Sequence, residues 1–154
     1  MNQTEFSLGG YNFAQIWESN ENQSNPDELF AVMSSRLSWL WKEWFGSCAG
    51  VLEMLYQSGA LIPGSAALKL ISGSSSTPGD IDFVMASAHS DDVHHFLNDK
   101  GYELDASFGA SYVDRTYGTS GIQGFLLRRY RSDCRRVDVS IAPVRCDGSV
   151  IISN

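Results

Sequence analysis

The stretch 60–85, ALIPGSAALKLISGSSSTPGDIDFVM, decides the fold class. A short helix is expected at 66–71, and a serine-rich loop separates it from the run Asp-Ile-Asp-Phe-Val-Met at 80–85. The first residues of that run alternate between acidic and apolar, as in a strand, where side chains at i and i+2 share one face. We therefore expect Asp80 and Asp82 to project together from a strand, while the apolar residues beside them enter the core.

The flanking sequence extends this pattern into an α/β (α+β) domain. Apolar spacing and turn residues predict further helices at about 27–44, 47–57 and 90–100, strands at 60–62, 102–106, 125–130 and 136–142, and a Gly/Ser/Thr/Tyr loop at 109–121 that could form a flap. Such an order favours a mixed β-sheet flanked by helices, a minimal core preceded by N-terminal helices. We expect residues 1–26 to be a flexible or loosely docked arm and 27–154 to be a single domain.

Composition places the chain among globular proteins. Its 154 residues are 43% hydrophobic and 12% aromatic, well away from the disordered class. Three cysteines show no CxxC spacing, which favours free thiols in a reducing compartment. The N-terminus lacks the features of a signal peptide, and no apolar stretch approaches the ~20 residues of a membrane span. These features predict a soluble, intracellular (cytoplasmic) protein that does not insert into membranes.

Charge is distributed unevenly along the chain. The net charge is -7, which argues against a general nucleic-acid coat protein and against duplex DNA as a partner. Residues 1–110 hold 14 acidic and 4 basic side chains, whereas residues 111–154 hold 4 acidic and 7 basic ones, all arginine. A polyanionic ligand would therefore be attracted to the last third, where five arginines crowd one predicted hairpin.

A phosphate site is expected at the start of the short helix. Ser65 stands where a helix N-cap belongs, and Gly64 frees the backbone before it. The N–H groups of such a helix start, together with the serine hydroxyl, form a site for phosphate oxygens. Lys69 lies on the same helix and could also reach a phosphate. A plain helix cap is the alternative for Gly64 and Ser65.

Carboxylates supply the second part of the predicted site. Asp80 and Asp82 would repel each other unless a cation lies between them, and magnesium prefers one or two carboxylates together with phosphate oxygens. Asp138 alternates with apolar neighbours on the last predicted strand, and it would join the pair if the two strands are adjacent. The alternatives are a solvated strand end for the pair and, for Asp138, a surface ion pair with Arg135 or Arg136.

Together these motifs resemble a known superfamily. The residues Gly64-Ser65-Ala66-Ala67-Leu68, Pro78, Asp80-Ile81-Asp82 and the later Asp138 follow the order found in the DNA polymerase beta-like nucleotidyltransferases. The stretch is similar to uncharacterised fungal proteins of that superfamily, and the resemblance covers roughly residues 46–142. It implies a nucleotidyltransferase-like sheet.

The resemblance also implies an activity. Asp80 and Asp82 would ligate two magnesium ions, Asp138 would ligate the ion nearer the acceptor, and Ser65 would hold the β- and γ-phosphates of an NTP such as ATP. The expected reaction moves an NMP group from the NTP to a hydroxyl of a small molecule, protein or RNA. The alternative is a catalytically inactive module that binds a nucleotide or a protein partner through its aromatic helices. A homo- or hetero-oligomer, in which a partner supplies a missing wall of the site, is also compatible with the short chain.

Overall fold

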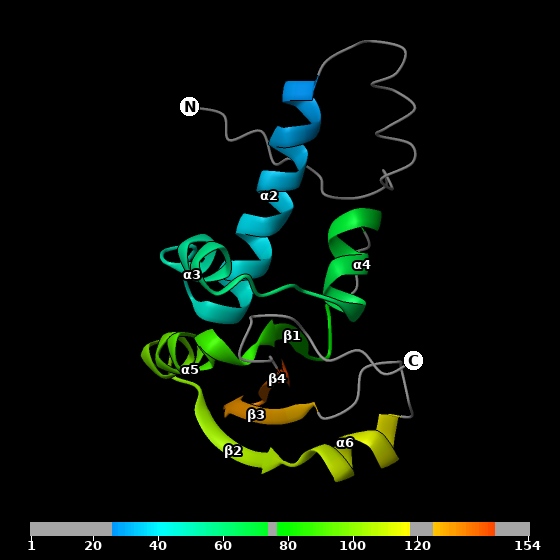
Figure 1. Ribbon diagram of the computed structural model, residues 1–154. Coiled ribbons are helices and arrows are strands. Elements are labelled where there is room, and N and C mark those ends of the chain that lie inside the picture. The colour runs from blue at the N-terminus through cyan, green and yellow to red at the C-terminus, as the bar shows by residue number, and fades with distance from the viewer. Residues whose placement is uncertain (1–25, 74–76, 118–124, 144–154) are drawn as a thin grey trace.

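The computed structural model describes residues 26–73, 77–117 and 125–143 (Figure 1). Its elements, in chain order, are α2 (Pro26–Phe45), α3 (Val51–Ser58), α4 (Gly64–Ser72), β1 (Ile81–Ala86), the 3₁₀ turn η1 (Ser87–His89), α5 (Ser90–Asp99), β2 (Glu103–Phe108), α6 (Ala110–Tyr117), β3 (Leu126–Ser132) and β4 (Arg135–Ala142). Apart from Pro26, the arm expected at 1–26 lies outside these ranges. The α/β class predicted from the sequence is confirmed.

The four strands form one mixed sheet in the order β1-β4-β3-β2. β1 and β4 run parallel, whereas β3 is antiparallel to both of its neighbours. The parallel pair is the one that matters for the site, because it places the Asp80–Asp82 segment beside the strand that carries Asp138.

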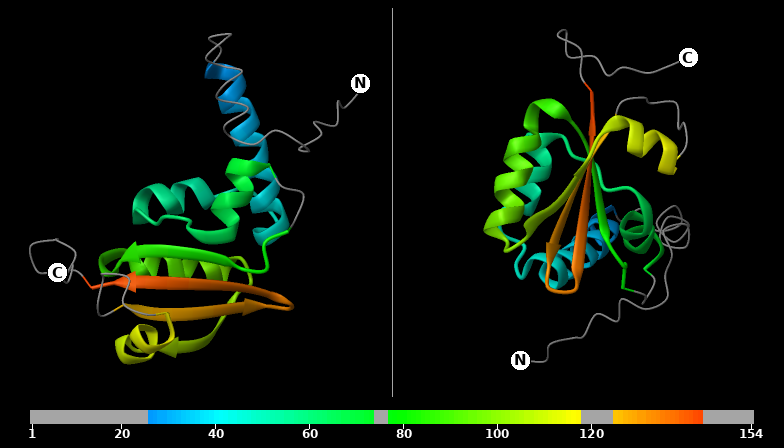
Figure 2. Two further views of the ribbon diagram at one scale, coloured as in Figure 1. Left: turned by 90° about the vertical axis from the view of Figure 1, so that its right-hand side faces the viewer. Right: turned by 90° about the horizontal axis from the view of Figure 1, so that it is seen from below.

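The two faces of the sheet differ in character. One face is apolar: Phe83, Val137 and Val139 are buried on it, and α5 covers it. The other face carries Asp82, Arg129 and Asp138, whereas Arg128 of β3 lies on the α5 side and pairs with Asp91. Figure 2, seen from below, shows α5 on one side of the strands and both α4 and α6 on the other. The predicted alternation of β1 is therefore confirmed, because its apolar residues enter the core and its acidic ones face α4.

Aromatic residues hold α2 against the sheet. The Phe45 ring lies 5.5 Å from that of Phe96, 5.7 Å from that of Tyr102 and 6.4 Å from that of Phe83, between centroids. The buried hydroxyl of Tyr102 donates a 2.7 Å hydrogen bond to the backbone oxygen of Trp44. Like Trp44, Trp41 is buried, so these two tryptophans belong to the core and not to a base-stacking surface.

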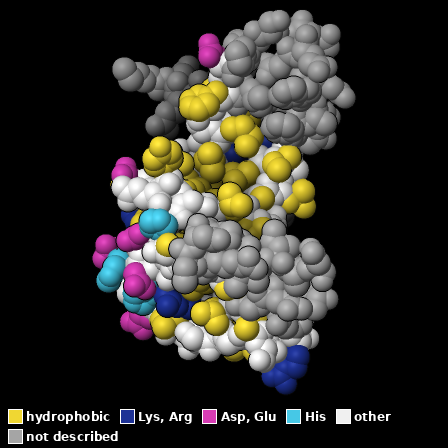
Figure 3. Space-filling model, viewed as in Figure 1, with side chains coloured by type: hydrophobic (Ala, Val, Ile, Leu, Met, Phe, Trp, Pro, Cys, Tyr) yellow, Lys and Arg dark blue, Asp and Glu magenta, His cyan; other side chains and the backbone are white. Residues whose placement is uncertain are grey.

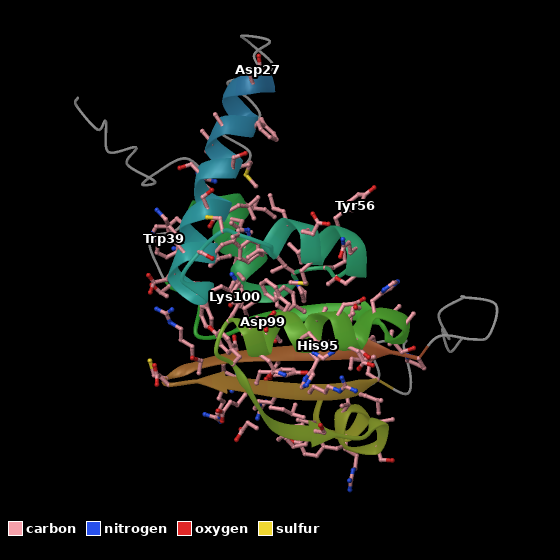
Figure 4. The ribbon with its side chains drawn as sticks, turned by 90° about the vertical axis from the view of Figure 1, so that its left-hand side faces the viewer. Asp27, Trp39, Tyr56, His95, Asp99 and Lys100 are labelled. Carbon is pink, nitrogen blue, oxygen red and sulfur yellow. The ribbon has the colours of Figure 1, made fainter. Side chains whose placement is uncertain are left out.

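Two long basic side chains connect elements that are distant in sequence. The buried Arg36 of α2 donates from Nη1 to the backbone oxygens of Leu70 at 2.9 Å and Ile71 at 3.1 Å, close to the C-terminal end of α4. Lys100, labelled in Figure 4, donates to Ser47 and Ala49, so the end of α5 is tied to the turn between α2 and α3. The first of these contacts fixes the helix that carries the predicted phosphate site.

Three predicted elements differ from the structure. The strand expected at 60–62 is a single antiparallel bridge from Leu61 to Val84, because Pro63 offers no N–H for a longer ladder. The side chain of Leu61 is exposed. The second helix begins at Val51, not near residue 47. The loop expected at 109–121 was wrong over 110–117, which form α6; Tyr112 stacks on Phe108 with centroids 4.4 Å apart. The remainder of that loop lies outside the described residues.

Candidate functional site

Three carboxylates converge on the face of the sheet opposite to α5. Asp82 of β1 lies directly beside Asp138 of β4 in the parallel register, so their side chains share one face. Asp80 immediately precedes β1, and it interacts electrostatically with Asp82, as Asp138 does. The structure thus brings together the three aspartates that the sequence pattern singled out.

Helix α4 begins against one of these carboxylates. Gly64 has a φ of +72°, and a Cβ atom placed on it would lie 3.2 Å from Oδ2 of Asp82. Glycine is the residue that tolerates this backbone conformation, and its lack of a side chain leaves room for the carboxylate. The acidic group and the N-terminal end of α4 therefore face the same space, where the helix presents free N–H groups.

The cap predicted at Ser65 is not formed. The helix begins one residue earlier, at Gly64, with Pro63 in extended backbone before it and no side-chain hydrogen bond capping the end. The N-terminal N–H groups of α4 therefore receive no side-chain cap. Ser65 instead lies in the first turn with an exposed side chain.

Asp138 is buried and paired with an arginine that the sequence analysis did not connect to it. Its two carboxylate oxygens accept 2.9 Å hydrogen bonds from Nε and Nη2 of Arg129, across from it on β3. The side chain of Asp138 is 6% exposed and that of Arg129 is 19% exposed. The alternative of a surface ion pair with Arg135 or Arg136 is met in part: Nε of Arg136 lies 3.8 Å from Oδ2 of Asp138, but Asp138 is buried and its hydrogen bonds come from Arg129. Arg135 bonds Glu43 at 2.7 Å instead.

A second arginine is bonded to Asp80. Arg136 donates from Nη2 to Oδ2 of Asp80, and its Nε lies 3.8 Å from Oδ2 of Asp138. That Nε is buried and has no hydrogen-bond partner among the described residues. Arg136 therefore lies between two of the three carboxylates and partly neutralises both.

Asp82 differs from its neighbours. No described residue donates a hydrogen bond to its carboxylate or forms an ion pair with it. Burial raises its pKa most, the charges of Asp80 and Asp138 raise it further, and Arg136 and Arg129 oppose that rise. Three carboxylates face two guanidinium groups, so the site retains a negative charge, and Asp82 is where it is least compensated.

These residues can accommodate a cation, within limits. Among the described residues, no three His, Cys, Asp or Glu side chains are grouped so as to hold a metal ion. Magnesium, however, commonly takes only one or two protein carboxylates and completes its shell with phosphate oxygens and water. Asp82, with Asp80 beside it, meets that smaller requirement, whereas both oxygens of Asp138 are already engaged by Arg129.

Lys69 packs against an aromatic ring of α2. Its ammonium is 4.4 Å from the centroid of the Trp39 ring on α2, and burial lowers its pKa. Figure 4 labels Trp39 on that helix. The role of Lys69 in nucleotide binding stays a prediction.

The sequence analysis missed Arg129 and Phe108 as parts of the site. The Phe108 ring lies 5.4 Å from Cζ of Arg129, so an aromatic face packs beside the ion pair. The register of the β3–β4 hairpin could have identified Arg129 as the partner of Asp138. With the turn at Asp133 and Cys134, Arg129 falls opposite Asp138.

Comparison with known proteins leaves the site to be interpreted from its own geometry. No model of a protein family, no curated protein and no solved structure matches this chain. None of the helices in the described part of the chain is long and apolar enough to span a bilayer.

Proposed function

We propose that this chain is a magnesium-dependent nucleotidyltransferase, which transfers an NMP group from an NTP to a hydroxyl acceptor. The acceptor oxygen would bond to the α-phosphorus, the bond from that phosphorus to the bridging oxygen would break, and pyrophosphate and the hydroxyl proton would be released. One observation carries the proposal: the carboxylate of Asp82 lies against Gly64 at the start of α4 and beside Asp138 in the sheet. A helix start suited to phosphate oxygens and an uncompensated carboxylate thus face one space, which is what a metal–triphosphate complex requires.

The residues have separate roles in this proposal. The exposed Ser65 hydroxyl and the N–H groups at the start of α4 bind the β- and γ-phosphates. Asp82 and Asp80 hold magnesium, and Asp138 contributes to a second ion nearer the acceptor. Bound magnesium would neutralise charge on the triphosphate and lower the pKa of the acceptor hydroxyl. The protein positions the reacting groups in line and stabilises the developing charge.

The acceptor belongs to a broad class. The hydroxyl of a small molecule, a protein or an RNA fits the proposal, and the net charge of -7 disfavours duplex DNA. Incubation of the protein with radiolabelled NTPs and a cell extract would identify the labelled acceptor.

The test is binding first and transfer second. Thermal unfolding of the full chain is followed with ATP, GTP, CTP or UTP, each with and without magnesium. We expect a magnesium-dependent rise in the melting temperature with at least one nucleotide, which disappears in the double variant Asp80→Ala, Asp82→Ala. No rise with any nucleotide, or a rise that persists in the double variant, refutes the proposed site.

A second function, a catalytically inactive binding module, is favoured by two observations. Asp138 and Asp80 are already paired with arginines, as a site that has replaced metal by guanidinium would be. Large apolar side chains are also exposed on the helical layer, where Figure 3 shows them gathered over α2, α3 and α4; Phe30 is 75% and Tyr56 91% exposed. Nucleotide binding without transfer of label to any acceptor would favour this function.

A further inference from the structure

We propose that residues 6–17 of this chain dock in cis on an exposed apolar surface of the helical layer, the α2–α4 face. This face is formed by Phe30 in the first half of α2 and by Leu68 and Ile71 of α4, whose side chains are 75%, 65% and 45% exposed. The inference does not depend on the proposed function, because the face lies on the helices and not in the carboxylate site.

The first half of α2 extends beyond the other described elements (Figures 1 and 2). Arg36, near the middle of that helix, bonds the backbone oxygens of Leu70 and Ile71 at the C-terminal end of α4. The turns of α2 before Arg36 therefore lie past the end of α4, and they carry the exposed Phe30 with Met33 one turn further on. Since helices in proteins are stabilised mostly by the packing of an apolar face, these turns call for an occupant.

Helix α4 continues the same surface. Leu68 and Ile71 are three residues apart and lie on one side of the helix, whereas Ala66 and Leu70 are buried. The exposed stripe of α4 ends beside α2, because the backbone oxygen of Ile71 accepts a hydrogen bond from Arg36. Figure 3 shows apolar side chains gathered over these helices. Contiguous exposed apolar patches of this kind mark interaction surfaces.

The chain itself supplies a segment of matching chemistry outside the described residues. Residues 6–17 contain no charged side chain and six large apolar or aromatic ones, namely Phe6, Leu8, Tyr11, Phe13, Ile16 and Trp17. The last three of these have the spacing of one helical face. Residues 18–25, Glu-Ser-Asn-Glu-Asn-Gln-Ser-Asn, are all polar. A polar linker thus separates an apolar segment from the start of α2.

The linker is long enough for this segment to reach the face. Its eight residues, 18–25, end where α2 begins at Pro26, and eight extended residues span up to roughly 26–29 Å. Arg36, which marks the end of α4, is ten residues from Pro26, or about 15 Å along the helix. The segment can therefore fold back over both helices. Tethering favours it over a second copy, because a short linker gives an effective concentration of about millimolar order.

Docking in cis would also bear on the choice between the two functions. Apolar side chains that the chain's own segment covers are not offered to a protein partner. The α2–α4 face would then no longer favour the binding module.

The experiment uses the full chain with a benzophenone amino acid in place of Ile16, and mass spectrometry identifies the residues cross-linked on irradiation. Unlabelled and isotope-labelled chains are mixed in equal amounts, so that links within one chain differ in mass from links between two. Phe30→Glu and Leu68→Glu each place a charge on the face. Leu104→Glu is the matched control, because Leu104 is 44% exposed and lies on β2, at the far side of the sheet from α2 (Figure 1).

We expect links within one chain from position 16 to residues of α2 or α4. Phe30→Glu or Leu68→Glu should reduce their yield by at least about tenfold, since a buried carboxylate without a hydrogen-bond donor disfavours docking. Leu104→Glu should leave the yield unchanged. The substituted side chains are exposed, so the fold should tolerate each change, and thermal melts verify that each variant is folded.

Links between labelled and unlabelled chains would assign the face to a second copy and overturn docking in cis. Links only to residues outside α2 and α4, or no links at all, overturn it as well. A yield that is equal in wild type, Phe30→Glu and Leu68→Glu has the same result, as does an equal loss in Leu104→Glu, which would show a general charge effect. None of these outcomes involves the carboxylate site, so the proposed function stands or falls on its own test.

Discussion

Gly64→Ala should damage the site and the fold together, and Gly46→Ala separates the two effects. Gly46 follows the end of α2 and Gly64 begins α4, and both have a positive φ, +71° and +72°. A Cβ at Gly46 would have no atom within 4 Å, whereas at Gly64 it would lie 3.2 Å from Oδ2 of Asp82. Both variants therefore place an alanine at a positive φ, and only Gly64→Ala also meets the carboxylate.

The magnitude follows from these two contributions. An alanine forced into the left-handed region costs about 1–2 kcal/mol. Part of this cost is offset in both variants, because alanine lowers the entropy of the unfolded chain and less entropy is then lost on folding. At Gly64 the carboxylate must also move by a few tenths of an ångström, and overpacking adds about 1–3 kcal/mol in general. Asp82 is half-buried, so its side chain has some room to move, and we expect an extra cost of about 1 kcal/mol, near the lower limit of that range.

Urea unfolding followed by tryptophan fluorescence measures the stability difference, and thermal shift with Mg–NTP measures the site. A difference of 1 kcal/mol corresponds to roughly 2–4 °C in melting temperature for a chain of this size. We expect Gly64→Ala to melt lower than Gly46→Ala by about that amount and to lose the nucleotide-dependent rise that Gly46→Ala retains. Equal stability and equal nucleotide response in the two variants would refute the juxtaposition of α4 and Asp82.

Three further changes test the charges and the core. Asp82→Asn should raise the free energy of unfolding at pH 7, because a raised pKa means that ionising Asp82 costs stability in the folded state. In urea titrations this gain should shrink as the pH falls through the raised pKa of folded Asp82 and vanish once the pH lies below the ordinary carboxyl pKa, whereas Asp105→Asn, on the surface, should show no gain. Arg36→Met should cost about 1.5–3 kcal/mol in the same assay, since it removes two charged hydrogen bonds to α4. Tyr102→Phe should cost about 1 kcal/mol at pH 7. Burial raises the pKa of Tyr102 to about 12, so the wild-type stability that depends on its neutral phenol is present below pH 10 and lost as pH rises through about 12. Burial also raises the pKa of Tyr130, so Tyr102→Phe should reduce the alkaline loss without abolishing it; a variant that loses as much stability as wild type over this range would contradict the assignment.

Much of the fold could be predicted because its signals are local. The helical apolar spacing of α2 and the alternation in β1 are properties of contiguous residues, and both elements lie within two residues of the predicted bounds. Helix α6 was missed because it is short and its small, polar and aromatic residues were read as a loop, although its sequence is amphipathic. In the structure Tyr112, in its first turn, stacks on Phe108. The bridge at Leu61 shows the opposite error, since an apolar run suggested a buried strand that Pro63 prevents.

The site was predictable in its residue types but not in its pairing. Parallel neighbouring strands placed Asp82 beside Asp138, as the pattern required. The bond between Arg129 and Asp138 depends on hairpin register, and a turn misplaced by one residue moves every arginine to the other face. Charge partners across a sheet can therefore be predicted only once the strand register is known, and composition and spacing do not fix that register.

The three carboxylates differ in their hydrogen-bond donors, and this difference favours a ligand at the site. A purely structural ion network would be more stable if every partly buried carboxylate had a hydrogen-bond donor, because an uncompensated charge lowers the stability of the fold. Arg129 and Arg136 satisfy Asp138 and Asp80, yet Asp82, between these two and against the start of α4, has no donor among the described residues. That deficit is concentrated at one point facing a helix start, where a cation bound to phosphate would compensate it. The same arrangement in an inactive module would leave Asp82 as a net cost, so nucleotide-dependent metal binding at Asp82 is the result that separates the two functions.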